Sequence, residues 1–291
     1  MGQAFDIKAP GVRRRLKDIT LNTVEAGPED GPLVILLHGF PEFWWGWRYQ
    51  IGPLVEAGFR VVAPDQRGYN LSNKPQGRRA YHIDILAKDV IELADALGRE
   101  TFHVVGHDWG GLVAWWTASR YPERVAKLVA INAPHPSVVG PYMRSHPRQM
   151  ARSFYAGFFQ LPFLPEAALS ANSYRSLKQA LVRSARLGTF SEDDLRHYEE
   201  TWSHSGALTA MINWYRALPL APTREVLRTR LSMPVRVLWG VDDPFLEKGL
   251  AEDSLALCDN GTALWVEKAG HFVQHEEPDL INRALVDFLK A

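Results

Sequence analysis

Val104-Val105-Gly106-His107-Asp108-Trp109-Gly110-Gly111 is a point where an apolar run ends in a cluster of glycines, and apolar residues at helical spacing follow. This order predicts a strand that turns sharply into a helix, with Asp108 at the tip of the turn. Gly106 and Gly110, two positions before and after the tip, leave the room that so tight a bend requires. The common form of this turn carries a nucleophilic serine, so an aspartate at the tip predicts a reaction that suits a carboxylate.

Strands and amphipathic helices alternate on both sides of this turn. Apolar runs predict strands at 16–25, 33–37, 59–63, 101–105 and 125–131, and periodic patterns predict helices at 44–55 and 83–97. Such alternation is typical of an α/β fold with a mostly parallel central sheet, flanked by helices and joined by right-handed crossovers. Sheets of this kind carry their sites at the carboxyl ends of the strands, where the glycine- and aspartate-rich turns of this chain fall.

The pattern changes between residues 137 and 220. Buried-strand runs give way there to amphipathic helical segments with aromatic residues, arginines and proline-bearing joints. Strands return at 235–239 and 263–266, before a last helix at 279–289. The simplest organisation is an α/β core formed by residues 1–136 and 221–291, with a helical cap at 137–220 inserted between two of its strands.

The charge balance and the cysteine content limit the classes of partner and compartment. The 291 residues include 33 basic and 33 acidic side chains, which gives no electrostatic reason to expect a nucleic acid or a membrane as partner. Cys258 is the single cysteine, so no internal disulfide can form. The N-terminal residues are polar and basic and lack the apolar run of a signal peptide, so we expect a cytoplasmic protein. We expect no metal and no cofactor, since neither metal-ligand spacings nor a phosphate loop occur in the sequence; the oligomeric state stays open.

Two later strand ends carry a carboxylate and an imidazole. The strand at 235–239 leads into Gly240-Val241-Asp242-Asp243-Pro244, and the strand at 263–266 is followed by Gly270-His271-Phe272. Asp108, Asp243 and His271 then occur in the chain order nucleophile, acid, base, which is known for triads built on the strand ends of an α/β sheet. We therefore predict that these three residues are catalytic.

The sequence resembles the α/β-hydrolase-fold enzymes and, among them, the soluble epoxide hydrolases. The motifs that carry the resemblance are His38-Gly39-Phe40-Pro41-Glu42, Trp47-Arg48-Tyr49-Gln50, Ala63-Pro64-Asp65-Gln66-Arg67-Gly68-Tyr69, the glycine-rich turn and Gly270-His271-Phe272 in the core, with Tyr155-Ala156-Gly157-Phe158-Phe159-Gln160 and Asn213-Trp214-Tyr215-Arg216 in the cap. The resemblance implies that Tyr155 and Tyr215 point at Asp108 and donate to the epoxide oxygen. It also implies that Asp243, which precedes Pro-Phe-Leu, is the acid rather than its neighbour Asp242.

A carboxylate nucleophile suits displacement at a saturated carbon. Asp108 is ionised at neutral pH without help from a base, and its attack on an epoxide carbon gives an ordinary alkyl ester. His271, oriented by Asp243, is then available to activate the water that hydrolyses this ester. The backbone N–H groups of Phe40 and Trp109 are the predicted oxyanion donors. We therefore predict an epoxide hydrolase whose substrates are water and a small apolar epoxide.

Aromatic and histidine residues near these motifs are candidates for the substrate pocket. They are His38, Pro41, Trp44, His107, Phe158 and Phe272. A haloalkane or haloacid dehalogenase on the same scaffold is the first alternative, because it would also use Asp108, Trp109 and His271. A halide leaving group needs no proton, however, so the paired tyrosines favour an epoxide. A non-catalytic small-molecule receptor is the alternative from another class.

Overall fold

The computed structural model describes residues 4–6, 8–9, 11–220 and 230–291. Its centre is an eight-stranded sheet in the order β1-β2-β4-β3-β5-β6-β7-β8. The strands are β1 Val12–Arg15, β2 Thr20–Ala26, β3 Leu33–Leu37, β4 Arg60–Pro64, β5 Phe102–His107, β6 Val125–Ile131, β7 Leu231–Gly240 and β8 Cys258–Val266. Only the β1–β2 and β2–β4 pairings are antiparallel, so the expected mostly parallel sheet is confirmed. Residues 221–229, which begin the predicted C-terminal part of the core, lie outside the described residues.

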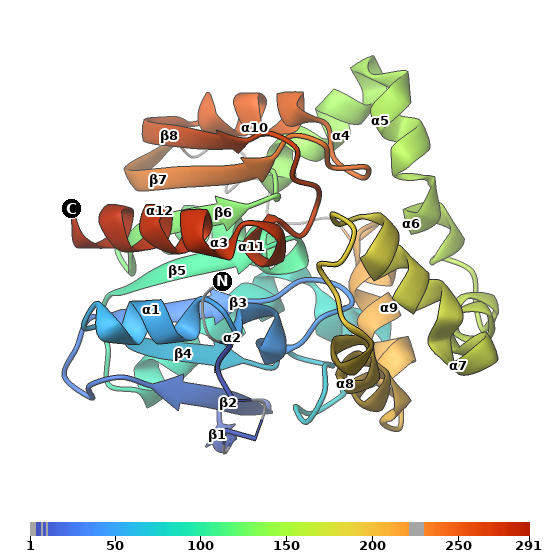
Figure 1. Cartoon of the computed structure of the whole chain (residues 1–291), viewed down its shortest axis with the longest axis horizontal. Helices are drawn as coiled ribbons and strands as arrows, with labels where there is room; N and C mark the ends of the chain where they lie inside the picture. Colours follow the sequence, from blue (N-terminus) through green and yellow to red (C-terminus); the bar gives the residue numbers. More distant parts are fainter. Residues whose placement is uncertain (1–3, 7, 10, 221–229) are drawn as a thin grey trace.

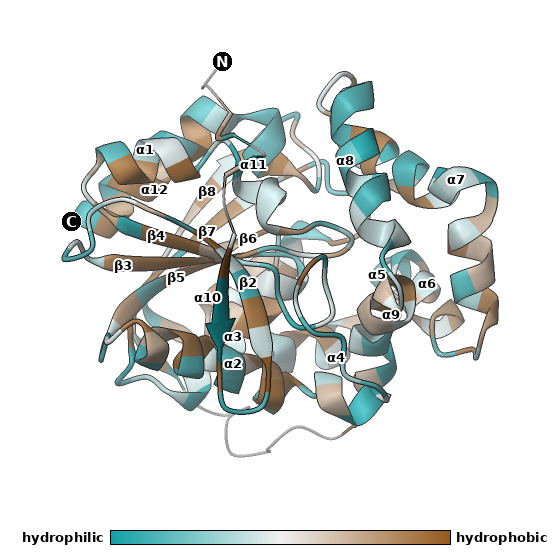
Figure 2. Cartoon of the chain, turned by 90° about the horizontal axis from the view of Figure 1, so that it is seen from below, coloured by the Kyte–Doolittle hydropathy of each residue, from teal (hydrophilic) through white to brown (hydrophobic). Residues whose placement is uncertain are grey.

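Helices cover both faces of the sheet, as Figure 1 shows. On one face lie α1 Ile51–Glu56 and α12 Pro278–Lys290, and on the other lie α2 Ile83–Ala96 and α3 Trp109–Arg120. Every residue of β3 is buried, as a parallel strand covered on both faces requires. In Figure 2 the central strands are mostly hydrophobic, whereas the edge strand β1 is hydrophilic.

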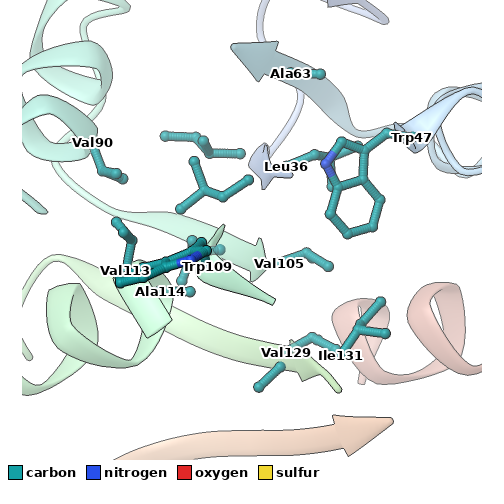
Figure 3. Close-up of a cluster of buried hydrophobic side chains, with 14 of the residues drawn as sticks. Leu36, Trp47, Ala63, Val90, Val105, Trp109, Val113, Ala114, Val129 and Ile131 are labelled. Carbon is teal, nitrogen blue, oxygen red and sulfur yellow. The ribbon is translucent and has the colours of Figure 1, made fainter. Parts of the chain in front are cut away.

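The core continues from the sheet into the helix that follows the glycine-rich turn. Figure 3 shows Trp109, Val113 and Ala114 of α3 beside the buried strand residue Val105. Trp109 is 6% exposed and the other three are fully buried. Because α3 packs against the buried strands of the sheet, the hydrophobic core fixes the position of the turn that precedes this helix.

The described helices between β6 and β7 lie beyond the carboxyl ends of the parallel strands (Figure 1). They are α4 Pro136–Ser145, α5 Pro147–Arg152, α6 Phe154–Phe158, α7 Leu164–Arg183, α8 Glu192–Ser203 and α9 Ala207–Ala217. Pro147 begins α5 and Pro165 stands in the first turn of α7, positions at which a missing backbone N–H costs little. We refer to α4–α9 as the cap. The remaining helices of the C-terminal part include α10 Lys248–Leu255 and α11 Val273–Glu276.

Two predicted elements differ from the structure. The strand expected at 16–25 begins only at Thr20, as β2, because residues 16–19 form the turn of a hairpin with β1, in which the Leu16 N–H donates to the Ile19 carbonyl. An exposed edge strand rich in arginine has no hydrophobic signal, so its position was not evident. The helix expected at 44–55 is a short 3-10 turn, Trp44–Trp47, followed by α1. The tryptophans of that turn are buried in the core, and the apolar pattern that they form with the residues of α1 is what predicts one continuous helix.

The position of the site follows from the sheet topology. The strand β3 pairs with β4 on one side and with β5 on the other, so the chain order reverses between β3 and β5. The loops after these two strands therefore leave a crevice at the carboxyl edge of the sheet, which is where open α/β sheets bind ligands. Among the described helices, none is both long enough and apolar enough to cross a bilayer.

Candidate active site

The turn between β5 and α3 presents Asp108 in a strained backbone conformation. Asp108 has φ 50° and ψ −120°, values that an L-residue adopts only when its surroundings hold it there. A Cβ atom added to Gly106 would lie 2.2 Å from the Gly110 carbonyl oxygen, and one added to Gly110 would lie 2.0 Å from the Leu37 carbonyl oxygen. Only glycine fits at these two positions, so the expected sharp turn is explained by close packing of backbone on backbone.

The loops after β7 and β8 bring Asp243 and His271 to the same edge. The His271 Nδ1 atom lies 2.7 Å from Asp243 Oδ2, and the His271 Nε2 atom lies 3.5 Å from Asp108 Oδ2. Asp243 is buried, whereas Asp242 is exposed. The structure thus brings the predicted nucleophile, acid and base together, and their chemical roles stay predictions.

Asp243 is held by contacts that the sequence motifs do not reveal. Its Oδ1 atom accepts the backbone N–H of Phe245 at 2.7 Å, and its Oδ2 atom accepts the Asn132 side-chain amide at 2.7 Å. Asn132 follows β6, and its own amide oxygen accepts the Gly240 N–H at 2.8 Å. With both oxygens bonded, the Asp243 carboxylate has one orientation, which fixes the ring of His271.

Burial and charge act in opposite directions on the central pair. Burial alone would lower the pKa of His271, but the Asp243 and Asp108 carboxylates outweigh it and raise the pKa to about 10. Burial alone would raise the pKa of Asp108, but its contact with His271 and the Phe40 N–H lower the pKa instead. At neutral pH the free protein therefore holds an imidazolium between two carboxylates.

This charge arrangement predicts a pH dependence of stability. The pKa of His271 is raised from 6.5 to about 10 on folding, so its contribution is fully present below 6.5 and is lost as the pH rises toward 10. We expect the free energy of unfolding of the wild type to fall more between about pH 6 and about pH 9 than that of His271→Gln, measured by urea unfolding. Parallel pH curves for the two proteins would contradict a raised pKa in the folded state.

One of the two predicted oxyanion donors contacts Asp108. The Phe40 N–H donates to Asp108 Oδ1 at 2.8 Å. Trp109 is the first residue of α3, and the first N–H groups of a helix have no partner within the helix. The indole of Trp109 packs against Tyr215, with 4.9 Å between ring centroids. The Phe40 N–H is therefore already bonded to the carboxylate, and the Trp109 N–H stays a predicted donor.

The two cap tyrosines approach Asp108 from α6 and α9. The rings of Tyr155 and Tyr215 are 5.8 Å apart between centroids. Burial, together with the charges of Asp108 and Asp243, raises the pKa of Tyr155, and burial next to Tyr155 and Asp108 raises the pKa of Tyr215 far above its usual value. Both hydroxyls therefore keep their protons and can act as donors.

Two cavities meet at these residues. One has a volume of about 320 Å³ and the other about 190 Å³, and Asp108, Tyr155 and Tyr215 line both. The walls of the larger cavity are mainly apolar and include Leu86, Trp109, Leu112, Trp116, Val139 and Leu246. The walls of the smaller cavity include Phe40, Pro41, Phe159, Leu177, Leu181 and Phe272.

The predicted pocket residues separate into two groups. Pro41 and Phe272 line the smaller cavity together with His271. Four others, in contrast, are not among the described residues that line the two cavities: His38, Trp44, His107 and Phe158. Phe159, the residue that directly follows α6 and keeps its helical backbone conformation, lines the cavity in place of Phe158, because one residue along a helix turns the side chain by about 100°.

His107 belongs instead to a buried polar network behind the site. Its Nε2 atom lies 2.9 Å from the His271 carbonyl oxygen, and its Nδ1 atom lies 3.3 Å from the Glu42 carboxylate. Glu42 also contacts His275 Nε2 at 2.8 Å and accepts the Tyr198 hydroxyl at 2.7 Å. Burial alone would raise the pKa of Glu42, but His275 and His107 hold it well below its usual range. The His38 pKa, in contrast, is lowered by burial to about 4, so that ring is neutral.

Comparisons with known proteins agree with this geometry. A family model described as alpha/beta hydrolase fold matches residues 32–278. The AB hydrolase superfamily protein YfhM of Bacillus subtilis is 48% identical over 94% of this chain and 95% of its own, and epoxide hydrolase 4 of Homo sapiens is 38% identical over 95% and 78%. A solved epoxide hydrolase of Bacillus megaterium, in complex with an inhibitor, superposes with a TM-score of 0.87 at 31% identity over 96% of this chain and 100% of its own.

Proposed function

Because this chain belongs to the epoxide hydrolase family of the α/β-hydrolase fold, we propose that it opens an apolar epoxide to a vicinal diol through an ester of Asp108. One observation carries the proposal: an ionised carboxylate at a strained turn is faced by two protonated tyrosines, the half-buried Tyr155 and the buried Tyr215, and by the His271–Asp243 pair. A carboxylate attacks, a phenol protonates, and an imidazole activates water, so each group has one task.

In the first step an Asp108 oxygen attacks one epoxide carbon. The new C–O ester bond forms as the C–O bond of the epoxide breaks, and the expelled alkoxide takes a proton from Tyr155 or Tyr215. The raised pKa of both tyrosines suits this transfer, because the hydroxyls hold their protons until a strong base develops beside them. Bound Asp108 is now a neutral ester.

The second step depends on what that neutralisation does to His271. The Asp108 charge is one of the causes that raise the pKa of His271, and it disappears when the ester forms. The imidazolium then gives up its proton more readily, and this proton restores the tyrosine hydroxyl that was deprotonated in the first step. The neutral ring takes a proton from water as the water attacks the ester carbonyl carbon, and it returns a proton to the diol oxygen as the ester C–O bond breaks. The Phe40 N–H, already 2.8 Å from Asp108 Oδ1, stabilises the oxyanion until the diol leaves.

The two cavities support a substrate with apolar groups on both sides of the reacting carbon. A mainly hydrophobic cavity with a few convergent polar groups is the usual form of a small-molecule site. Here the polar groups gather where the cavities meet, at Asp108 and the two tyrosines, whereas the far walls are aliphatic and aromatic. The unequal volumes favour one longer and one shorter apolar substituent.

The first test offers the purified protein an aryl epoxide and, separately, a chloroalkane. We expect diol from the epoxide and little chloride from the haloalkane. In heavy-oxygen water with the enzyme in excess, the first turnover should leave the label in Asp108 and give unlabelled diol. Labelled diol in that turnover would mean direct attack by water, chloride release would support a dehalogenase, and tight binding without product would support a receptor.

A further inference from the structure

A carboxylate outside the reacting centre joins the loop of His271 to the cap. Glu276 ends α11 and is only 9% exposed. Its two oxygens accept the Gly270 N–H at 2.9 Å and 3.0 Å, and one of them also accepts the Arg186 N–H at 3.0 Å. Gly270 directly precedes His271, and Arg186 lies in the connection between α7 and α8 of the cap (Figure 1).

A second contact acts on the backbone of His271 itself. The His271 N–H donates to the Ser184 carbonyl at 3.0 Å. Ser184 ends α7 and, with Leu177 and Leu181 of that helix, lines the smaller cavity. A Cβ added to Gly270 would lie 2.5 Å from the Ser184 carbonyl oxygen, so the two segments are in close backbone contact. The wall of the cavity and the loop of His271 are therefore joined by direct backbone contacts.

The backbone of His271 is thus held from two directions. Its N–H is bonded to the cap through Ser184, and its carbonyl lies 2.9 Å from His107 of the core turn. The imidazole must keep its 2.7 Å contact with Asp243 while it faces a water beside the Asp108 ester. A displacement of about 1 Å at such a group is enough to cost about 10²-fold in rate.

From these contacts we propose that Glu276 is a positioning residue for the second chemical step, the hydrolysis of the Asp108 ester. This inference rests on the proposed function. Ester formation uses the carboxylate of Asp108 and the tyrosine hydroxyls, and it needs no base. Ester hydrolysis needs His271 in place, so loosening its loop slows the second step and leaves the first largely unchanged.

The experiment follows the two steps separately in Glu276→Ala and Glu276→Gln, with Glu277→Ala as the matched control. The Glu277 carboxylate accepts a hydrogen bond from the exposed Arg186 guanidinium at 2.6 Å. Single-turnover mixing with an aryl epoxide, followed by intact-mass measurement, gives the rates at which the ester forms and disappears. We expect Glu276→Ala to slow ester hydrolysis by about 10- to 100-fold with ester formation within about threefold of wild type.

The remaining variants and outcomes distinguish positioning from a general loss of structure. Glu276→Gln keeps one carbonyl acceptor, so we expect partial recovery of ester hydrolysis, and Glu277→Ala should match the wild type in both steps. If Glu276→Ala does not fold, the proposal is tested in Glu276→Gln, in which the rate of ester hydrolysis should fall relative to the rate of ester formation. Equal slowing of both steps, or no slowing of either, would overturn the role of Glu276. A wild type that never forms the ester would instead overturn the proposed function.

Discussion

Replacing Asp108 with alanine should abolish diol formation. The carboxylate supplies the oxygen that attacks the epoxide carbon, and no other carboxylate of the described residues lines both cavities. We expect kcat/KM for an aryl epoxide to fall by at least about 10⁴-fold, the scale on which removal of a covalent nucleophile acts. Diol formation measured by chromatography, and the loss of any adduct in the intact mass, check this result.

The loss has to be separated from a loss of folding. Asp108→Ala removes contacts with the Phe40 N–H and with His271, but it keeps the Cβ atom at a turn whose φ is 50°. Thermal unfolding should therefore still show one cooperative transition. Asp242→Ala is the matched control, because it removes an exposed carboxylate next to Asp243 and should keep wild-type turnover. Activity of Asp108→Ala within tenfold of the wild type would contradict a nucleophilic role.

The parts of the site that sequence alone predicts are local in the chain. Glycines at fixed offsets from Asp108 indicate the sharp turn around it. The loops of Asp243 and His271 each follow an apolar run that ends in a glycine or a charged residue. A parallel sheet then brings such loops to one edge whatever lies between them. The order of the elements, the mostly parallel sheet and the meeting of these three side chains were therefore predictable.

The contacts that support the site are of another kind, because they join residues far apart in the chain. Glu276 meets Arg186 across 90 positions, and Asn132 meets Asp243 across 111. No periodicity or motif marks such pairs, since each depends on how the cap and the core pack. Trp44 is predicted from its sequence neighbours to line the pocket, but it is buried in the core, and its backbone N–H donates to Asp65 Oδ1 at 3.1 Å, 21 positions away.

Replacing both cap tyrosines with phenylalanine should prevent ester formation with an epoxide. Without the hydroxyls of Tyr155 and Tyr215, the expelled oxygen would leave as a free alkoxide in an apolar cavity, which is strongly unfavourable. We expect the rate of ester formation in the double variant to fall by about 10³-fold or more, near the upper part of the range for general acid catalysis. Rapid mixing with an aryl epoxide and intact-mass detection of the adduct measure this rate.

The single variants make the test of these two hydroxyls sharper. Both side chains line the same cavities as Asp108, so one hydroxyl remains as a donor when the other is removed. The activation free energy of ester formation should therefore rise in each single variant by less than half of its rise in the double variant. Tyr69→Phe is the control, since Tyr69 is buried against His38, 4.7 Å away between ring centroids, and does not line either cavity. Near-normal formation of the ester from an aryl epoxide in the double variant would contradict the role of these two hydroxyls as the proton donors to the expelled oxygen.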